Sequence, residues 1–402
     1  MNLLALKSRQ FRLYIFSVHI ALNGFWAQRV IIGWLAWDLS GSAGFVGFVA
    51  FLNLLPTIFV SFLFGVIADR IDVRLGTITT YSCAGIVSAG LAVIYFADLL
   101  NSFLLACFSL IAGFITSANH PIRMSLAPRL APLEHLSSVV AFTSLNFNLS
   151  RLIGPVIGGV LLNYIGIASA IFLTALTYTA PIIAIYFTHP RGRQNGLTND
   201  HSGYIFELKE GLTYVANHRI LQVAIIFSFV TAFAGRSVLE TLPILANDVF
   251  GRGPSALGLM TSAAGGGAVI AALLKTFLSA PKPNTFPLHS LILVVTTPLL
   301  VILVSFATDF YHMTLLVAVL GMSITFTAIS LQSLVQMRIE DHFRGRVMGL
   351  WTTITMGSGA IGAFTMGLIA ELFGASTAQF SIGTVLATLG LIAISRLSTR
   401  KS

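Results

Sequence analysis

The chain has 402 residues, of which 56% are hydrophobic and 9% are charged. Soluble domains carry roughly 25% charged residues, so this composition excludes a water-soluble protein with a polar shell and predicts a chain surrounded by lipid. The formal net charge of +9 does not indicate nucleic-acid binding, because the basic residues lie between apolar runs and not on a soluble domain.

Twelve apolar runs follow one another along the chain, and each is long enough to cross a bilayer, which takes about 20 residues in a helix. Turn and capping residues separate the runs, for example at 38–42 and 251–255. The sequence therefore predicts an all-α membrane protein with twelve transmembrane helices, at 11–37, 44–68, 77–97, 101–123, 138–164, 168–188, 220–247, 255–279, 285–307, 310–337, 346–373 and 376–396.

One long polar stretch, 189–219, divides the chain into an N-terminal bundle at 1–188 and a C-terminal bundle at 220–402. The two parts are related, because the run 150–159 aligns with the run 358–367 at a shift of about half the chain. Internal repeats with a substrate site near the midplane are typical of secondary transporters. We therefore predict two pseudo-symmetric bundles of six helices each, joined by a cytoplasmic linker.

Lysine and arginine are distributed unevenly between the two sets of loops. The loops on the side of the N-terminus contain nearly all of them, whereas the opposite loops contain Arg252 beside Asp38, Asp98, Asp248 and Asp309. Positive residues remain on the cytoplasmic side of a membrane. The sequence thus predicts a multi-pass protein of the cell (inner) membrane with both termini in the cytoplasm.

Four ionisable residues stand out inside predicted spans, where a charge costs at least ~2.5–3.5 kcal/mol at the helix centre. Arg236 and Glu240 share one face of the seventh span, and Arg29 lies in the outer half of the first. The pair is either a proton-coupling site or a structural ion pair. Arg29 either contacts substrate or extends to the outer surface. The fourth residue, Arg151, lies in the fifth span.

The loop after the second span resembles the signature of the major facilitator superfamily at this place: glycine, three residues, Asp-Arg and further basic residues. It departs from that signature at Asp72, where glycine is usual, and at Val73, where a basic residue is usual. The resemblance implies a gate between the two bundles formed by Gly65, Asp69, Arg70, Arg74, Arg344 and Arg346.

The fifth span is similar to the Gly-Pro-x-x-Gly-Gly motif found in exporters of the same superfamily. Glycines four residues apart share one helix face and allow close packing, and proline removes one helix hydrogen bond. The alternative is a general small-residue packing face, and both readings can hold together. The residues concerned are Arg151, Gly154, Pro155, Gly158 and Gly159.

Further stretches resemble the bacterial branch that contains the enterobactin exporter and macrolide efflux proteins: 26–29, 34–42, 121–123 and 343–348. The arginine that proton antiporters of the superfamily often carry in the fourth span has no counterpart within 109–117. For substrate or proton coupling we single out Gln28, Arg29, Arg236 and Glu240.

The prediction is a secondary active transporter that exports small amphipathic organic molecules, such as drugs or siderophore-like metabolites, by alternating access and proton antiport. A nutrient importer of the same fold, a membrane enzyme and a lipid scramblase are the alternatives. We expect no metal and no cofactor, because Cys83 and Cys107 lie in apolar runs without ligand spacing. The expected partners are a small-molecule substrate, the proton and the lipid bilayer, with the protein as a monomer.

Overall fold

The computed structural model describes residues 3–68, 71–191, 204–278, 286–340 and 343–398, and all regular elements in these ranges are helical. The first part contains η1 (Leu3–Lys7), α1 (Arg9–Ser40), α2 (Ala43–Ala68), α3 (Val73–Phe96), α4 (Ser102–Leu126), η2 (Ala127–Leu130), η3 (Leu133–His135), α5 (Leu136–Thr177) and α6 (Thr179–Tyr186). The second part contains α7 (Tyr204–Asn217), α8 (Arg219–Glu240), α9 (Leu242–Ile244), η4 (Leu245–Val249), α10 (Gly253–Thr276), α11 (Leu288–Val304), α12 (Phe310–Gln336), α13 (Arg344–Phe373) and α14 (Ala375–Ser398).

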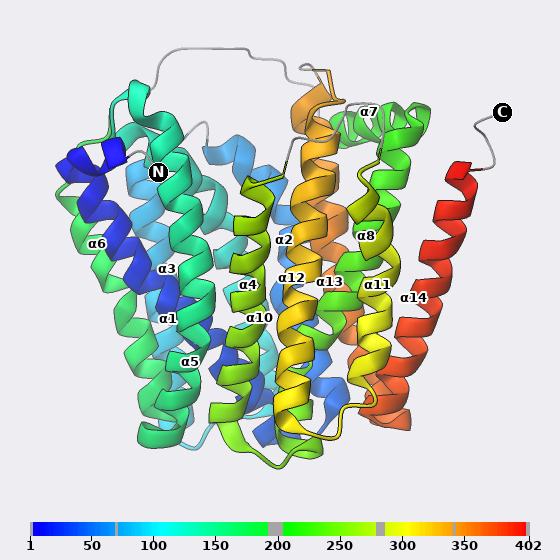
Figure 1. The fold of residues 1–402 in the computed structure, drawn as a ribbon. Coiled ribbons are helices and arrows are strands. Elements are labelled where there is room, and N and C mark those ends of the chain that lie inside the picture. Colours follow the sequence, from blue (N-terminus) through cyan, green and yellow to red (C-terminus); the bar gives the residue numbers. More distant parts are fainter. Residues whose placement is uncertain (1–2, 69–70, 192–203, 279–285, 341–342, 399–402) are drawn as a thin grey trace.

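The long helices stand side by side, and α7 lies across one end of the bundle (Figure 1). The start of α1 and the end of α14 lie at this same end, which we call the terminal face; the other end is the opposite face (Figure 1). Within the described residues, ten helical segments are long and apolar enough to cross a membrane, and α11 is a shorter apolar helix. The prediction of an all-helical membrane protein is confirmed.

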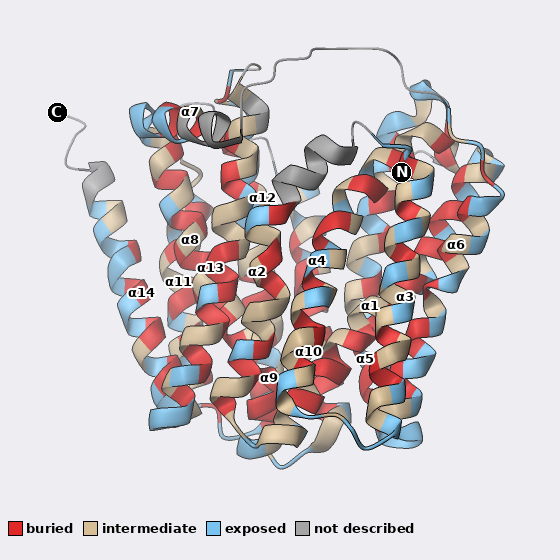
Figure 2. Ribbon diagram, turned by 180° about the vertical axis from the view of Figure 1, so that it is seen from behind, coloured by how far each residue is buried: buried red, intermediate tan, exposed pale blue. Residues whose placement is uncertain are grey.

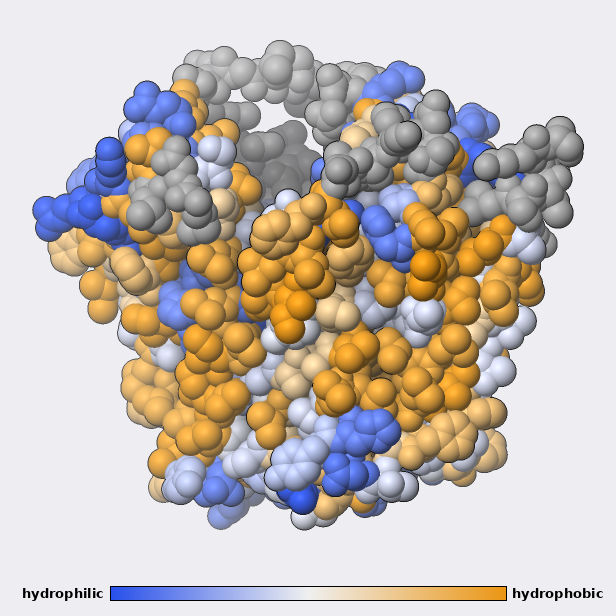
Figure 3. Space-filling model, viewed as in Figure 1, coloured by the Kyte–Doolittle hydropathy of each residue, from blue (hydrophilic) through white to orange (hydrophobic). Residues whose placement is uncertain are grey.

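The outer surface matches a lipid environment. Large apolar side chains such as Phe103, Phe114 and Leu315 are 74%, 47% and 62% exposed. On the face that Figure 3 shows, hydrophobic residues cover the middle of the molecule, and hydrophilic residues gather toward its two ends. Buried residues lie on the helix faces that meet inside the bundle (Figure 2). The apolar exterior therefore faces lipid, and packing between helices holds the interior together.

Polar residues begin helices at the breaks that separate the spans. The side chain of Asn101 accepts a hydrogen bond from the backbone N–H of Leu104 at 2.9 Å. Asp309 accepts from the N–H groups of Tyr311 and His312 at 2.8 and 3.0 Å. The N–H groups at the start of a helix have no hydrogen-bond partner within that helix. Hydrogen bonds from the His312 and Tyr311 N–H groups hold the pKa of Asp309 below its usual range.

Two glycines at equivalent positions of the internal repeat turn the chain back at the opposite face. Gly166 has φ 76° and ψ 172° inside the long helix α5, and Gly374, between α13 and α14, has φ 84° and ψ 156°. Residues other than glycine rarely adopt a positive φ. The same shift of about half the chain that aligns 150–159 with 358–367 relates these two turns. The predicted repeat thus extends to backbone conformation.

A second pair of repeat-related glycines allows helices from the two parts of the chain to touch. A Cβ atom on Gly159 of α5 would lie 2.8 Å from the carbonyl oxygen of Pro254 and 3.1 Å from the Cα of Gly258 on α10. A Cβ on Gly367 of α13 would lie 2.7 Å from the carbonyl oxygen of Ala43 on α2. Backbone meets backbone at both contacts, so neither position has room for a side chain.

Replacing Gly367 by alanine is therefore expected to destabilise the protein, because backbone atoms must move to admit one methyl group. Overpacking of this kind costs about 1–3 kcal/mol. Thermal unfolding of the purified variant in detergent should show a lower midpoint than wild type. Gly90→Ala is the matched control, because a Cβ at Gly90 of α3 meets nothing within 4 Å. An unchanged midpoint in Gly367→Ala would contradict the close contact between α2 and α13.

Candidate functional site

An ion pair joins the first and second parts of the chain inside the bundle. Nη2 of Arg29 on α1 donates to Oε1 of Glu240, the last residue of α8. The side chains are 25% and 13% exposed. Arg29 lies eleven positions before the end of α1, about 16 Å at 1.5 Å per residue. The charged groups therefore meet near the middle of the bundle, where neither is fully hydrated.

Local sequence fixes the position of Glu240. The helix α8 ends at Glu240, and Pro243 follows three residues later in the short helix α9. Proline has no N–H group and cannot continue the helical hydrogen-bond pattern. The predicted continuous span at 220–247 is thus divided into α8, α9 and the π-helical turn η4. This division places the carboxylate at a helix end, close to α1.

Arg236 lies one turn before Glu240 and approaches the same carboxylate oxygen at 4.0 Å, from Nη1. Its aliphatic stem packs against α13, since a Cβ on Gly359 would lie 2.3 Å from Cδ of Arg236. The predicted i, i+4 pair is confirmed as a geometric arrangement. Arg29 is nevertheless the closer partner of Glu240, and the sequence did not indicate this contact.

Arg151 adds a third guanidinium to the same region. The Cζ atoms of Arg29 and Arg151 lie 5.7 and 5.8 Å from the centroid of the Trp26 ring, within the range of cation–π attraction. Trp26 thus connects Arg151 to the Arg29–Glu240 pair. In the part of the chain that the structure describes, no carboxylate lies within 4 Å of the Arg151 guanidinium.

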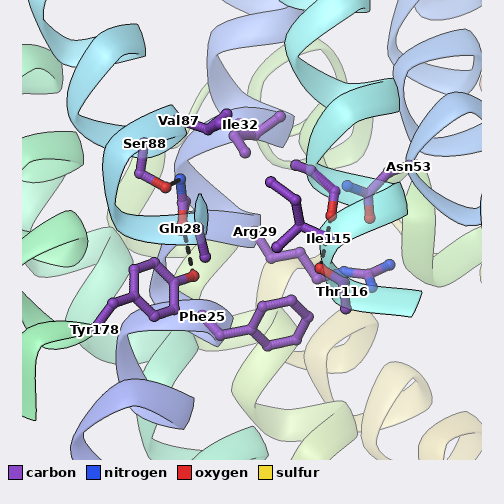
Figure 4. A pocket seen from close by; sticks show the side chains of 12 residues that line it. Phe25, Gln28, Arg29, Ile32, Asn53, Val87, Ser88, Ile115, Thr116 and Tyr178 are labelled. Carbon is purple, nitrogen blue, oxygen red and sulfur yellow. Dashed lines mark hydrogen bonds between the residues drawn. The ribbon is translucent and has the colours of Figure 1, made fainter. Parts of the chain in front are cut away.

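Arg29 also lines an open pocket of about 420 Å³ (Figure 4). The preceding residue, Gln28, is buried, and both the nitrogen and the oxygen of its side-chain amide are hydrogen-bonded. Its Nε2 donates to Ser88 Oγ at 2.6 Å, and Tyr178 Oη donates to its Oε1 at 2.9 Å, as the dashed lines in Figure 4 show. Gln28 therefore fixes α1 against its neighbours in this conformation, and Arg29, the next residue, points into the pocket.

A second pocket of about 610 Å³ lies between the two parts of the chain, with walls from α1, α2, α8, α9 and α10. Arg29 and Glu240 both line it, and Arg29, Ile32 and Asn53 are common to the two pockets. Asn53 was not predicted as a site residue, although an amide inside the apolar run 44–68 was a visible signal. The Arg29–Glu240 pair thus stands in the wall between two cavities.

The exporter-like motif of the fifth span lies where α5 meets two other helices. A Cβ on Gly154 would lie 2.5 Å from Cβ of Trp26, and one on Gly158 would lie 2.6 Å from the carbonyl oxygen of Ala27, both on α1. Gly159 faces α10, as does the carbonyl group of Pro155. The motif therefore packs α5 against α1 on one side and against α10 on the other.

The predicted gate is described only in part. Asp69 and Arg70 lie outside the described residues, and for Gly65 and Arg344 the structure gives the helix without the side-chain environment. Arg74 lies against the end of α6, where its Nε donates to the carbonyl oxygen of Ile185 at 3.2 Å. Arg346 pairs with Glu210 of α7 at 2.8 Å. Of the predicted gate residues, Arg346 is therefore the one whose ion pair is visible here.

Metal binding has no support in the described ranges, where no three His, Cys, Asp or Glu side chains form a group that could hold an ion. The charged cluster of Arg29, Arg151, Arg236 and Glu240 is dominated by guanidinium groups, which do not ligate metals. What the cluster offers chemically is the binding of a proton on one carboxylate and of anions on three cations.

Comparison with known proteins identifies the family. Residues 2–402 match the family described as transmembrane secretion effector. The multidrug efflux pump Tap of Mycobacterium tuberculosis is 25% identical over 389 residues, which cover 95% of this chain and 92% of the pump. The staphyloferrin A transporter of Staphylococcus aureus is 25% identical over 367 residues, which cover 90% of each chain.

Solved transporters share the fold. The nucleoside transporter NupG superposes with a TM-score of 0.72 at 13% identity, covering 97% of this chain and 99% of its own. A bacterial homologue of the human lysosomal transporter Spinster, in an inward-facing and occupied conformation, superposes with a TM-score of 0.73 at 12% identity, covering 96% and 97%. The chain belongs to the transmembrane secretion effector family and is a multi-pass transporter of the major facilitator type.

Proposed function

We propose that this transporter exports small amphipathic organic molecules from the cell by alternating access, in exchange for protons. The observation that carries the proposal is the Arg29–Glu240 pair, which joins α1 to α8 in the wall between two pockets. A pair that connects the two parts of the chain beside a cavity can respond to both substrate and proton. The efflux function of the related Tap pump supports the outward direction.

The proposal of twelve membrane spans depends on the break at Gly166 and on the short helix α11. The apolar stretch Leu133–Tyr186 exceeds the length of one crossing, and Gly166 turns it back at the opposite face. The helix α11 has 17 residues, which spans about 26 Å at 1.5 Å per residue. With these two crossings added, the chain forms two six-helix bundles, 1–188 and 220–402, joined by the linker 189–219.

The conformation favours access from the terminal face. Toward the opposite face, α5 contacts α10 and α2 contacts α13 through the glycines at positions 159 and 367. Leu145 lies fourteen residues before Gly159, nearly four helical turns, so it shares that face of α5 nearer the terminal face, and it is 44% exposed. We assign the terminal face to the cytoplasm on the distribution of basic residues. The structure then corresponds to an inward-facing state of a protein in the inner membrane.

Cysteine labelling tests this orientation. In a background with Cys83→Ser and Cys107→Ser, an impermeant maleimide applied to intact spheroplasts should label Ala97→Cys and Ser376→Cys at the opposite face. Glu134→Cys and His189→Cys at the terminal face should react only after lysis. All four positions are exposed. Labelling of His189→Cys in intact spheroplasts would reverse the assignment.

The gate proposal uses the pair at the start of α13. In the present conformation Arg346 is held by Glu210 of α7, and Gly211 packs beside it, with a Cβ position 3.4 Å from Cβ of Arg346. We propose that Arg346 exchanges Glu210 for Asp69 when the cytoplasmic side closes. The helix N-terminus of α13 adds to the attraction for a carboxylate.

Two substitutions that each replace a carboxylate by an uncharged amide should consequently shift the conformational equilibrium in opposite directions. Glu210→Gln removes the partner of the inward-facing state, and accessibility of cavity residues from the cytoplasm should fall several-fold. Asp69→Asn removes the partner of the closed state, and the same accessibility should rise. The measurement is the alkylation rate of a cysteine placed at Asn53, which lines both pockets. Equal rates in the two variants would refute the exchange of partners.

The transport activity itself is tested in everted membrane vesicles. Respiration acidifies the lumen, and a proton-coupled exporter should then accumulate its substrate there. Two probes of opposite charge serve as substrates: 1-naphthylacetate and ethidium. Accumulation of either compound above that of vesicles without the protein supports export, whereas accumulation confined to right-side-out vesicles would indicate an importer.

A further inference from the structure

The charged cluster has more positive than negative charge. Three guanidinium groups, those of Arg29, Arg151 and Arg236, lie in the same region as the single carboxylate of Glu240. Glu240 is bound closely by Arg29 and is 4.0 Å from Arg236. With all four groups ionised, the described cluster therefore carries two uncompensated positive charges near the middle of a membrane protein.

Uncompensated arginine in this position is costly. A charged side chain at the bilayer centre costs at least ~2.5–3.5 kcal/mol unless it is paired or hydrated. Arg151 has no ion-pair partner in the described part of the chain, and its guanidinium lies over the face of Trp26. Cation–π attraction of about 0.5–2 kcal/mol offsets only part of that cost. The site therefore has unused capacity for an anion.

Arg29 and Glu240 bring the cluster to the edge of the cavities, whose lining defines the rest of such a ligand. Apart from Arg29, Glu240, Asn53 and Thr261, the second pocket is lined by aliphatic residues and proline. Phe25 and Ile32 provide apolar walls in the first. Guanidinium groups bind carboxylates and other oxyanions through two parallel hydrogen bonds. A ligand suited to both features carries an oxyanion on an apolar body.

We infer that the transporter binds amphipathic organic anions, with the carboxylate of the substrate held by the positive charge of Arg151 and Arg236 beside the Arg29–Glu240 pair. This assignment of the substrate class rests on the proposed export function. The same site cannot favour a cationic drug over an anion of equal size.

The test compares three compounds that differ mainly in charge. These are 1-naphthylacetate (anionic), 1-naphthylacetamide (neutral) and 1-naphthylethylamine (cationic). Binding is measured by calorimetry on the purified, delipidated protein in an uncharged detergent at pH 7. Wild type is expected to bind the anion at least tenfold more tightly than the amide, and the amine most weakly.

Variants locate the site. Arg151→Gln should reduce naphthylacetate affinity at least tenfold and leave the amide unchanged, and Arg151→Lys should retain part of the preference for the anion. Arg252→Gln is the control for charge, because Arg252 is exposed at the opposite face, over the Phe310 ring. If Arg151→Gln does not fold, the preference among the three compounds in wild type still decides the question.

The outcomes separate this inference from the proposed function. No preference for the anion in wild type, or an unchanged affinity in Arg151→Gln, would overturn the anion site. Energised accumulation of ethidium in everted vesicles would still support export in that event. A lipid headgroup is the other source of an oxyanion. If phosphatidylglycerol displaces naphthylacetate in micelles and naphthylacetate is not accumulated by vesicles, the site belongs to lipid and the substrate assignment is wrong.

Discussion

Replacing Glu240 by glutamine is expected to reduce uphill export to the level of vesicles without the protein. Glutamine has nearly the same size and can still accept a hydrogen bond from Arg29, but it cannot bind and release a proton. Binding of 1-naphthylacetate should remain, as should exchange down a concentration gradient. The measurements are energised accumulation in everted vesicles and calorimetric affinity, made on the same preparation.

A control separates coupling from stability. Asp248→Asn makes the same carboxylate-to-amide change at an exposed residue of η4 near the opposite face, and it should export normally. If the Arg29–Glu240 pair were only structural, Glu240→Gln would lower the thermal midpoint while the folded fraction exported at the wild-type rate. Intact proton coupling in Glu240→Gln would remove this residue from the mechanism.

Replacing Arg29 by glutamine is expected to move the pH optimum of export upward, and to move it further than Arg236→Gln does. A nearby cation favours the ionised form of a carboxylate, so its loss lets Glu240 take up a proton at higher pH. Arg29 is in direct contact with the carboxylate, whereas Arg236 is 4.0 Å away. The measurement is the rate of substrate-induced proton flux in proteoliposomes between pH 5 and 9.

Two results would contradict this order. An equal shift in Arg29→Gln and Arg236→Gln would mean that the Arg29–Glu240 contact affects the pH optimum no more than Arg236 does. A downward shift would mean that Glu240 is not the group that titrates. Glu240→Gln combined with Arg29→Gln should show no pH shift beyond that of Glu240→Gln alone, because the titrating group is absent.

The fold was largely predictable from the sequence, because lipid imposes long apolar helices and glycine marks the turns. The predicted span 310–337 agrees with α12, Phe310–Gln336. The break after Glu240 was missed, because a hydrophobic run does not show that Pro243 divides it into shorter helices. The turn at Gly166 was indicated by the internal repeat, in which Gly166 and Gly374 occupy equivalent positions.

The candidate site was predictable only where its contacts are local. Arg236 and Glu240 are four residues apart on one helix, so their proximity follows from helix geometry. Arg29 and Glu240 are 211 residues apart, and their contact depends on the register between α1 and α8. The sequence offered substrate contact or extension to the surface for Arg29, and the structure shows an ion pair. Asn53 and the role of Trp26 depend on the same tertiary packing.

The most direct test of export in exchange for protons is accumulation in everted membrane vesicles energised by respiration. The lumen becomes acidic, and protein-containing vesicles should accumulate 1-naphthylacetate or ethidium well above vesicles that carry the Glu240→Gln variant. A protonophore should release the accumulated compound. Accumulation that is unaffected by the protonophore, or that is equal in wild-type and Glu240→Gln vesicles, would contradict proton-driven export through this site.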